Sequence, residues 1–321
     1  MHIRQLRDAR AAAHPFVCAP APASRAFGVA GGLLAEDPRS MHDIEANECA
    51  AYRSLFEVGA ALFGRASFEV RDVDGATAFL SPLMRRPGVF NRVLGLGLSR
   101  PMTTGLLRSL REEYQRVGCV PSFELLPACL DAETSAALRA QQIRRVATSV
   151  QLVRTLDGGP VEPVTSGASE PVRPQVRAVS GAGCRIVAAL CTEVFELPAP
   201  VLALLEALQD QPGWTHWVAL LDGQPCGAAL TYTLGDRCWF GWACTLPAWR
   251  GRGVKGALDD ARIAAADDEG CSWISTDTGT GTPSTPDRSL QSLLHRGFTA
   301  AHLRASYLPA APAGTEVKRE A

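Results

Sequence analysis

The residues best suited to chemistry lie in one stretch, Cys244–Leu258, which reads Cys-Thr-Leu-Pro-Ala-Trp-Arg-Gly-Arg-Gly-Val-Lys-Gly-Ala-Leu. It begins at the end of a β-branched and aromatic run and ends within an amphipathic helical pattern. Glycines let a backbone approach a ligand closely, and a helix N-terminus presents free N–H groups to an anion such as a pyrophosphate. The stretch therefore predicts an anion-binding turn. Its glycines and basic residues are Gly251, Gly253, Gly256, Arg250, Arg252 and Lys255.

The order of strand, proline, Arg-Gly-Arg-Gly and helix resembles the acetyl-CoA loop of the GNAT N-acetyltransferases, which has the pattern Arg/Gln-x-x-Gly-x-Gly/Ala. Arg250, Gly251 and Gly253 match this pattern. The last small position is Lys255 here, and Gly256 follows one place later. The resemblance predicts a GNAT acetyltransferase domain over residues 175–309.

The end of the chain also resembles this family. Residues 289–298 read as a short helix followed by Gly-Phe, and a closing strand comes next. Many members carry an asparagine that contacts the cofactor where this chain has Ser292. Many also carry a tyrosine acid where this chain has Leu293. The resemblance therefore implies a weaker contact from Ser292 and no tyrosine acid.

By resemblance, acetyl-CoA is the cosubstrate, and its pantetheine arm would lie where the strand before the loop separates from the next strand. The backbone of Cys244, Thr245 and Leu246 would pair with that arm, and the N–H near Cys244 would face the thioester oxygen. The pyrophosphate would be held by the residues that follow: Arg250, Gly251, Arg252, Gly253, Val254, Lys255 and Gly256.

Acetyl transfer also needs a base to take a proton from the amine. Asp277 ends the strand beside the expected separation and is the first candidate; otherwise it is a turn or cap residue before Thr278-Gly279. Glu193 and His216 are further candidates, although a lone helical Glu usually faces solvent and a lone His beside tryptophans is usually packed. Cys244 could be a nucleophile, but a buried structural thiol is the alternative because no histidine lies near it in the sequence.

Three aromatic residues alternate on strands near the expected acceptor side, where core packing is the other explanation for them. They are Tyr232, Trp239 and Trp242. The pattern of the second half predicts helices over 182–195 and 198–208, a hairpin turning at Asp222-Gly223, and a helix after the loop that stops at Gly270.

The first half, residues 41–156, shows the same order of helix, three strands, helix, strand, helix and strand. Its strand-to-helix turn, Gly97-Leu-Ser-Arg-Pro-Met-Thr-Thr-Gly, lacks the Arg-Gly-x-Gly loop, and Pro101 removes a donor that a phosphate would use. We therefore expect a degenerate GNAT-like repeat without its own cofactor. The fold class predicted for the whole chain is α/β (α+β mixed sheet), with two tandem GNAT-like domains.

Composition sets the remaining limits. The 321 residues are 46% hydrophobic and 20% charged, with net charge −1, which gives no basic field for nucleic acid. No apolar run is long enough for a membrane span, and ten scattered cysteines favour reduced thiols in the cytoplasm over disulfides or a metal site. Residues 157–174 predict a linker and 310–321 a disordered tail. Residues 1–40, Arg-rich and poor in acids, suggest a disordered or non-native extension rather than a transit peptide.

Together these features predict a cytoplasmic acetyl-CoA-dependent N-acetyltransferase acting by direct attack of an amine on the thioester. The acceptor would be a small-molecule or peptide amine, with no nucleic acid, membrane or metal involved, and the protein a monomer or homodimer. A non-catalytic acyl-CoA-binding module is the alternative, because Lys255, Ser292 and Leu293 depart from the family pattern. A structural pair of halves without any ligand is the third hypothesis.

Overall fold

The computed structural model describes residues 40–85, 87–156, 173–282 and 285–310. The first half follows the predicted order. Its elements are α1 (Met41–Phe63), β1 (Glu69–Val73), β2 (Ala76–Leu80), β3 (Arg92–Leu94), α2 (Thr104–Arg116), β4 (Ser122–Leu125), α3 (Ala132–Ala140) and β5 (Ile143–Thr155), with short 3₁₀ turns at Pro82–Met84 and Pro127–Cys129.

The second half repeats this order after an additional strand and with a pair of helices in place of one. Its elements are β6 (Gln175–Val179), α4 (Ala182–Val194), α5 (Pro200–Ala207), β7 (Trp214–Leu221), β8 (Gln224–Leu234), β9 (Arg237–Thr245), α6 (Val254–Asp268), β10 (Trp273–Gly279), β11 (Gly281–Thr282), β12 (Thr285–Pro286), α7 (Arg288–Leu294) and β13 (Thr299–Pro309). The β7–β8 hairpin turns at Asp222 and Gly223, both with positive φ, as the dipeptide predicts.

One mixed sheet of eleven strands runs through both halves in the order β1-β2-β3-β4-β13-β5-β10-β9-β8-β7-β6. The closing strands of the halves are exchanged within it. β13, from the second half, pairs with β4, and β5, from the first half, pairs with β10. β5 and β13 also pair with each other over ten residue pairs. Each half therefore completes its part of the sheet with a strand from the other.

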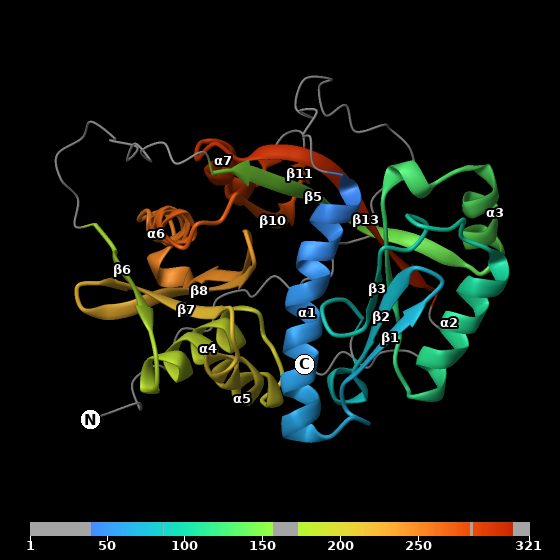
Figure 1. The fold of residues 1–321 in the computed structure, drawn as a ribbon, viewed down its shortest axis with the longest axis horizontal. Coiled ribbons are helices and arrows are strands. Elements are labelled where there is room, and N and C mark those ends of the chain that lie inside the picture. Colours follow the sequence, from blue (N-terminus) through green and yellow to red (C-terminus); the bar gives the residue numbers. More distant parts are fainter. Residues whose placement is uncertain (1–39, 86, 157–172, 283–284, 311–321) are drawn as a thin grey trace.

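Helix α1 lies between the two halves (Figure 1). Its sequence starts it firmly, because Ser40 and Asp43 form a capping box. Residues on several of its faces are buried, and Tyr52 packs edge-on against both Phe79 of β2 and Trp239 of β9. Asn47 donates to the Cys238 carbonyl and to Ser275 Oγ at the β9–β10 boundary. This helix of the first half thus covers strands of both halves.

The helices of the second half pack in two sets, one on each face of its sheet. α4 and α5 join α1 in one apolar cluster, together with Trp239 and Cys244 of β9. α6 and α7 pack on the opposite face, where Ile263 and Leu293 meet Phe240 of β9. The sheet therefore separates the loop at the start of α6 from the face that α1 covers.

The domain boundaries drawn from the sequence can be compared only in part with the structure. The predicted linker lies outside the described residues except for 173–174, as do the predicted extension except for Ser40 and the predicted tail except for Ala310. The order of elements predicted for the first half, the helices predicted over 182–195 and 198–208, the turn at Asp222-Gly223 and the helix ending before Gly270 are confirmed, with small shifts at the helix ends.

Candidate functional site

Strands β9 and β10 run parallel and then separate. Their pairing ends at Phe240 and Thr276, where Thr276 Oγ1 donates to the Phe240 carbonyl at 3.0 Å. Beyond this point β10 continues beside β5, with Asp277 opposite Gln151, while β9 continues beside β8. Among the described residues, the last part of β9, residues 241–245, therefore has no partner strand on the β10 side.

The separating end of β9 is irregular. The β8–β9 register shifts between the Ala228–Cys244 and Leu230–Gly241 pairs, and Trp242 in this bulge has φ of 53°. A bulge re-aims backbone groups and is frequent beside functional sites. Further on, the N–H of Leu246 donates to the Cys226 carbonyl at 3.0 Å. Thus the N–H of Leu246 is engaged within the chain, and Cys244 and Thr245 lie at the separated end.

The glycine loop opens α6 as the sequence predicts. Gly251 and Gly253 have φ of 78° and 77°, a region that favours glycine, and a Cβ on either would meet only open space. Gly253 is the N-cap of α6 and offers no side-chain cap, so the first N–H groups of this 15-residue helix have no capping side chain. This arrangement fits a pyrophosphate.

The charged residues of the loop are placed differently from one another. Arg250 and Arg252 are exposed; Arg250 Nε donates to the Thr245 carbonyl at 3.4 Å, and Arg252 lies over the Trp249 ring. Lys255 instead pairs with the buried Asp259 at 2.7 Å. Its pKa is lowered by burial, against the opposing effect of Asp259. Val254 is buried, so only its backbone could contact a ligand.

Gly256 and Ser292 are linked by an arginine that the sequence did not single out. A Cβ on Gly256 would lie 2.3 Å from the Arg296 guanidinium, which packs over this position. Arg296 also donates to Ser292 Oγ at 2.9 Å and pairs with Asp260 at 2.6 Å. Gly256 is therefore explained by close packing between α6 and α7, and the Ser292 hydroxyl already has a partner.

Asp277 is the first residue of β10 beyond the last pair with β9. It lies two residues after Ser275 and therefore on the same face of β10; since Ser275 binds Asn47 of α1, Asp277 faces α1 and not α6. Burial, followed by the negative charge of Glu48, raises the pKa of Asp277 to about 6, against the effect of Arg304 and Arg92. A carboxylate of this pKa is ionised at neutral pH and remains basic enough to accept a proton.

The other candidates for a base lie away from this point. His216 is buried on β7, where its Nε2 lies 2.7 Å from the Leu205 carbonyl, and burial lowers its pKa. Glu193 is exposed on α4. The Cys244 thiol is buried and directed at the Cys191 sulfur, 3.9 Å away. This geometry favours a structural thiol at Cys244.

The three aromatic residues predicted near the acceptor are held in the packing between α1, α4 and α5. Trp239 contacts Tyr52 and Trp214, and Tyr232 contacts Trp214 with ring centroids 5.0 Å apart. Trp242 packs between Phe90 of the first half and Phe195 of α4. Core packing therefore accounts for the positions of all three.

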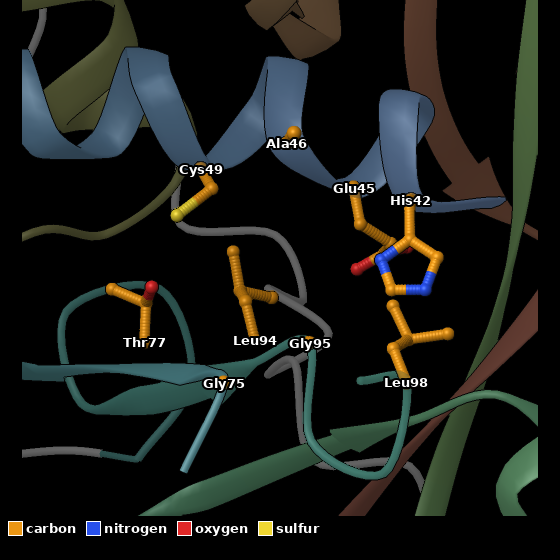
Figure 2. A pocket seen from close by; sticks show the side chains of 9 residues that line it. All are labelled: His42, Glu45, Ala46, Cys49, Gly75, Thr77, Leu94, Gly95 and Leu98. Carbon is orange, nitrogen blue, oxygen red and sulfur yellow. The ribbon is translucent and has the colours of Figure 1, made fainter. Parts of the chain in front are cut away.

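A corresponding place exists in the first half. β3 and β4 run parallel, and their pairing ends at Val93 and Phe123. A cavity of about 140 Å³ lies beside the next residue, Leu94. Figure 2 shows side chains from α1 and from the β3 end facing this cavity. The lining residues are His42, Glu45, Ala46, Cys49, Gly75, Thr77, Leu94, Gly95 and Leu98.

Comparisons with solved structures define the fold. Three solved structures match most of this chain. A GCN5-related N-acetyltransferase from Kribbella flavida has 16% sequence identity and a TM-score of 0.54, and the match covers 80% of this chain and 96% of that one. A tandem GNAT protein from the clavulanic acid biosynthesis pathway has 15% identity and a TM-score of 0.54, covering 83% and 92%, and a GCN5-related N-acetyltransferase from Sphaerobacter thermophilus has 15% identity and a TM-score of 0.53, covering 84% and 93%. No protein-family model and no curated protein matches the chain. The chain therefore has the tandem GNAT fold, as the sequence predicts.

Two further findings concern membrane-spanning helices and the cysteines. Within the described residues, no helix is both long and apolar enough to span a bilayer. All nine cysteines in this part of the chain are free thiols, and seven of them are buried.

Proposed function

We propose that this protein is an acetyl-CoA-dependent N-acetyltransferase whose second half binds the cosubstrate. One observation carries the proposal: β9 and β10 separate directly beside an uncapped, glycine-opened helix N-terminus, and Asp277 stands at the point of separation. These are the parts that acetyl transfer needs, namely an anion site, free strand edges and a base. The similarity in fold to N-acetyltransferases supports the same activity.

In this proposal the chain contributes positioning and proton transfer. N–H groups at the start of α6 would hold the pyrophosphate, with Gly251 and Gly253 providing the conformation. The backbone near Cys244 would pair along the pantetheine and donate toward the thioester oxygen, where negative charge develops during attack. Bound acetyl-CoA supplies the acyl group as an activated thioester.

Asp277 would accept the proton of the acceptor amine. It faces α1, on the side of the sheet opposite α6, so the amine would approach from the side that the first half covers. Leu293, which is 3% exposed and packs with α6 and the sheet, has no ionisable group and so offers no acid for the departing thiolate. We infer that solvent supplies that proton, and that the acceptor is a small-molecule or peptide amine.

The test is a screen of amine classes for release of CoA, followed by Asp277→Asn with the best acceptor. Loss of a general base should lower kcat/KM by about 100-fold or more while acetyl-CoA still binds. Asp268→Asn, an exposed carboxylate at the end of α6, is the matched control. Full turnover by Asp277→Asn would remove Asp277 from the mechanism.

A non-catalytic acyl-CoA-binding module remains the second candidate. It is favoured by the engagement of Lys255 with Asp259 and of Ser292 with Arg296, which leaves both side chains committed within the protein. This candidate predicts that acetyl-CoA binds in calorimetry but that no amine class releases CoA.

A further inference from the structure

A row of polar side chains crosses five neighbouring strands beneath α1. It connects the two halves, and its members are Arg92 on β3, Glu124 on β4, Arg304 and His302 on β13, Gln151 on β5 and Asp277 on β10. Glu45 and Glu48 of α1 cover the row, and apart from Asp277 every member is less than 8% exposed. The row ends at the proposed base.

Arg304 is the centre of this network. Its Nη1 lies 2.6 Å from Glu48 Oε2 and 3.2 Å from Glu45 Oε2. Its Nη2 lies 3.6 Å from Asp277 Oδ2, and the Gln151 amide oxygen, in its better orientation, accepts from the same guanidinium. The position of the guanidinium beside Asp277 is therefore fixed mainly by carboxylates of the first half.

Glu48 holds the second arginine as well. Its other oxygen, Oε1, lies 2.6 Å from Arg92 Nη2, and Arg92 also lies over the Tyr52 ring. Burial alone would raise the pKa of Glu48, but Arg304 and Arg92 outweigh burial and lower it to about 2. Glu48 is thus a permanent negative charge that binds both guanidiniums.

The formal charges do not balance. Four carboxylates, those of Glu45, Glu48, Glu124 and Asp277, share the two guanidiniums of Arg92 and Arg304. His302 Nε2 lies 3.2 Å from Glu45 and adds a charge only when protonated. Glu48 has the shortest contacts to both arginines. Glu124 lies 3.9 Å from Arg304 but also accepts from two serine hydroxyls, whereas Asp277, among the described residues, has only its 3.6 Å contact with Arg304. Asp277 is therefore the least compensated of the four carboxylates.

We propose that Glu48 and Arg304 are positioning residues for Asp277, so that the first half completes the catalytic site of the second. Asp277 is paired too weakly with Arg304 to be locked as a carboxylate, and the charge of Glu48 keeps its proton affinity high. The role of Asp277 as a base rests on the proposed function. The electrostatic coupling of Glu48, Arg304 and Asp277 does not rest on that function, because it follows from their positions alone.

The test is a ¹³C NMR titration of the Asp277 carboxyl group in the full chain, without any substrate. Glu48→Gln removes the charge that repels the Asp277 carboxylate and that neutralises both arginines, so the titration midpoint of Asp277 should fall by roughly 1 to 3 pH units. Glu57→Gln removes a carboxylate from an exposed position of the same helix and should leave the midpoint in place.

Glu48→Gln leaves buried guanidiniums with fewer partners, so its fold must be verified by thermal unfolding. Glu124→Gln provides a second variant, since Glu124 also raises the pKa of Asp277, and it should cause a smaller fall. An unchanged midpoint in folded variants, or an equal shift in Glu57→Gln, overturns the inference.

The pH dependence of kcat/KM distinguishes a failure of this inference from a failure of the proposed function. With an acceptor in hand, the acidic limb of kcat/KM should move to lower pH in Glu48→Gln by the same amount as the NMR midpoint. A midpoint that moves while Asp277→Asn keeps full turnover would refute the base and leave the coupling intact.

Discussion

The two halves share an order of elements but differ at two corresponding places. One is the N-terminus of the helix that follows β3 or β9, which is α2 or α6, and the other is the carboxylate on the next strand, Glu124 or Asp277. In the first half, the N-terminus of α2 is capped by Thr103, whose Oγ1 accepts from the Leu106 N–H at 3.1 Å. In the second half, Gly253 caps α6 without a side chain. A capped helix start has one free donor fewer, so only α6 is prepared for an anion.

The carboxylates differ in the same way. Glu124 follows the last β3–β4 pair just as Asp277 follows the last β9–β10 pair. Glu124 accepts hydrogen bonds from Ser122 Oγ at 2.7 Å and from Ser306 Oγ at 2.8 Å. Asp277, among the described residues, has only the longer contact with Arg304 within ion-pair distance. The two halves therefore have corresponding elements at this place, but Glu124 has two hydroxyl donors that Asp277 lacks among the described residues.

The largest expected effect comes from separating the halves. Because β5 and β13 are exchanged, separating the halves removes a neighbouring strand from each. In residues 41–156, β4 loses its neighbour β13, and in residues 175–309, β10 loses its neighbour β5. We expect each half alone to be insoluble or self-associated, and the two co-expressed halves to form a soluble complex. Size-exclusion chromatography measures this directly. A monomeric, cooperatively unfolding half would show that the strand exchange is dispensable.

The next effect compares the helices that precede the exchanged strands. Leu293 of α7 is 3% exposed and Leu138 of α3 is 4% exposed. Leu293→Ala and Leu138→Ala should each lower the free energy of unfolding by about 2–5 kcal/mol, through lost burial and a new cavity. Denaturant titration gives this cost. Because the Leu293 side chain has no proton to donate, the basic limb of the pH–rate profile should be the same in Leu293→Ala as in the parent.

A third comparison concerns positive-φ glycines. Gly253→Val should weaken acetyl-CoA binding about tenfold or more, because the residue at this N-cap must keep a left-handed backbone for the N–H groups to meet a phosphate. Gly118→Val imposes a similar strain at an exposed glycine after α2, where φ is 71°. Calorimetric titration of both variants should show a loss of affinity only for Gly253→Val.

Local sequence patterns were enough to predict most of this fold. Apolar residues at helical spacing, the Asp222-Gly223 turn and the Arg250–Gly253 loop each determine local geometry, so the helices, the hairpin and the start of α6 could be predicted. The capping box of Ser40 and Asp43 was missed. The strand exchange could not be predicted. Periodicity shows that β5 and β13 are strands, but both halves offer an edge for each, and the choice depends on the assembled tertiary structure.

The surroundings of Asp277 lay beyond the sequence for a similar reason. The charged groups that shift its pKa include Glu48, Arg92 and Arg304, which come from three elements. Glu48 and Arg304 lie 256 residues apart in the chain, and each is an ordinary charged residue in its own segment. Arg296, which occupies the space over Gly256, was missed as well. Its position one turn after Ser292, directly before Gly297-Phe298, was the available signal.

The smallest effect that we predict is a pH-dependent gain in stability for Asp277→Asn. The folded chain raises the pKa of Asp277 from 3.8 to about 6, so it holds this proton more tightly than the unfolded chain does. The stability linked to that proton is complete below the ordinary value and is lost as the pH rises through about 6. At pH 8 the parent therefore keeps a poorly paired carboxylate at this position, while the asparagine variant does not. Asp277→Asn should have a Tm a few degrees above that of the parent at pH 8 and close to it at pH 4. Glu124→Gln replaces one of the two oxygens that accept from Ser122 and Ser306 with an NH₂ donor, so it should have a lower Tm at pH 8. Equal effects of the two substitutions on the Tm at pH 8 would mean that Glu124 and Asp277 are equivalent, and would contradict the difference in their hydrogen bonding.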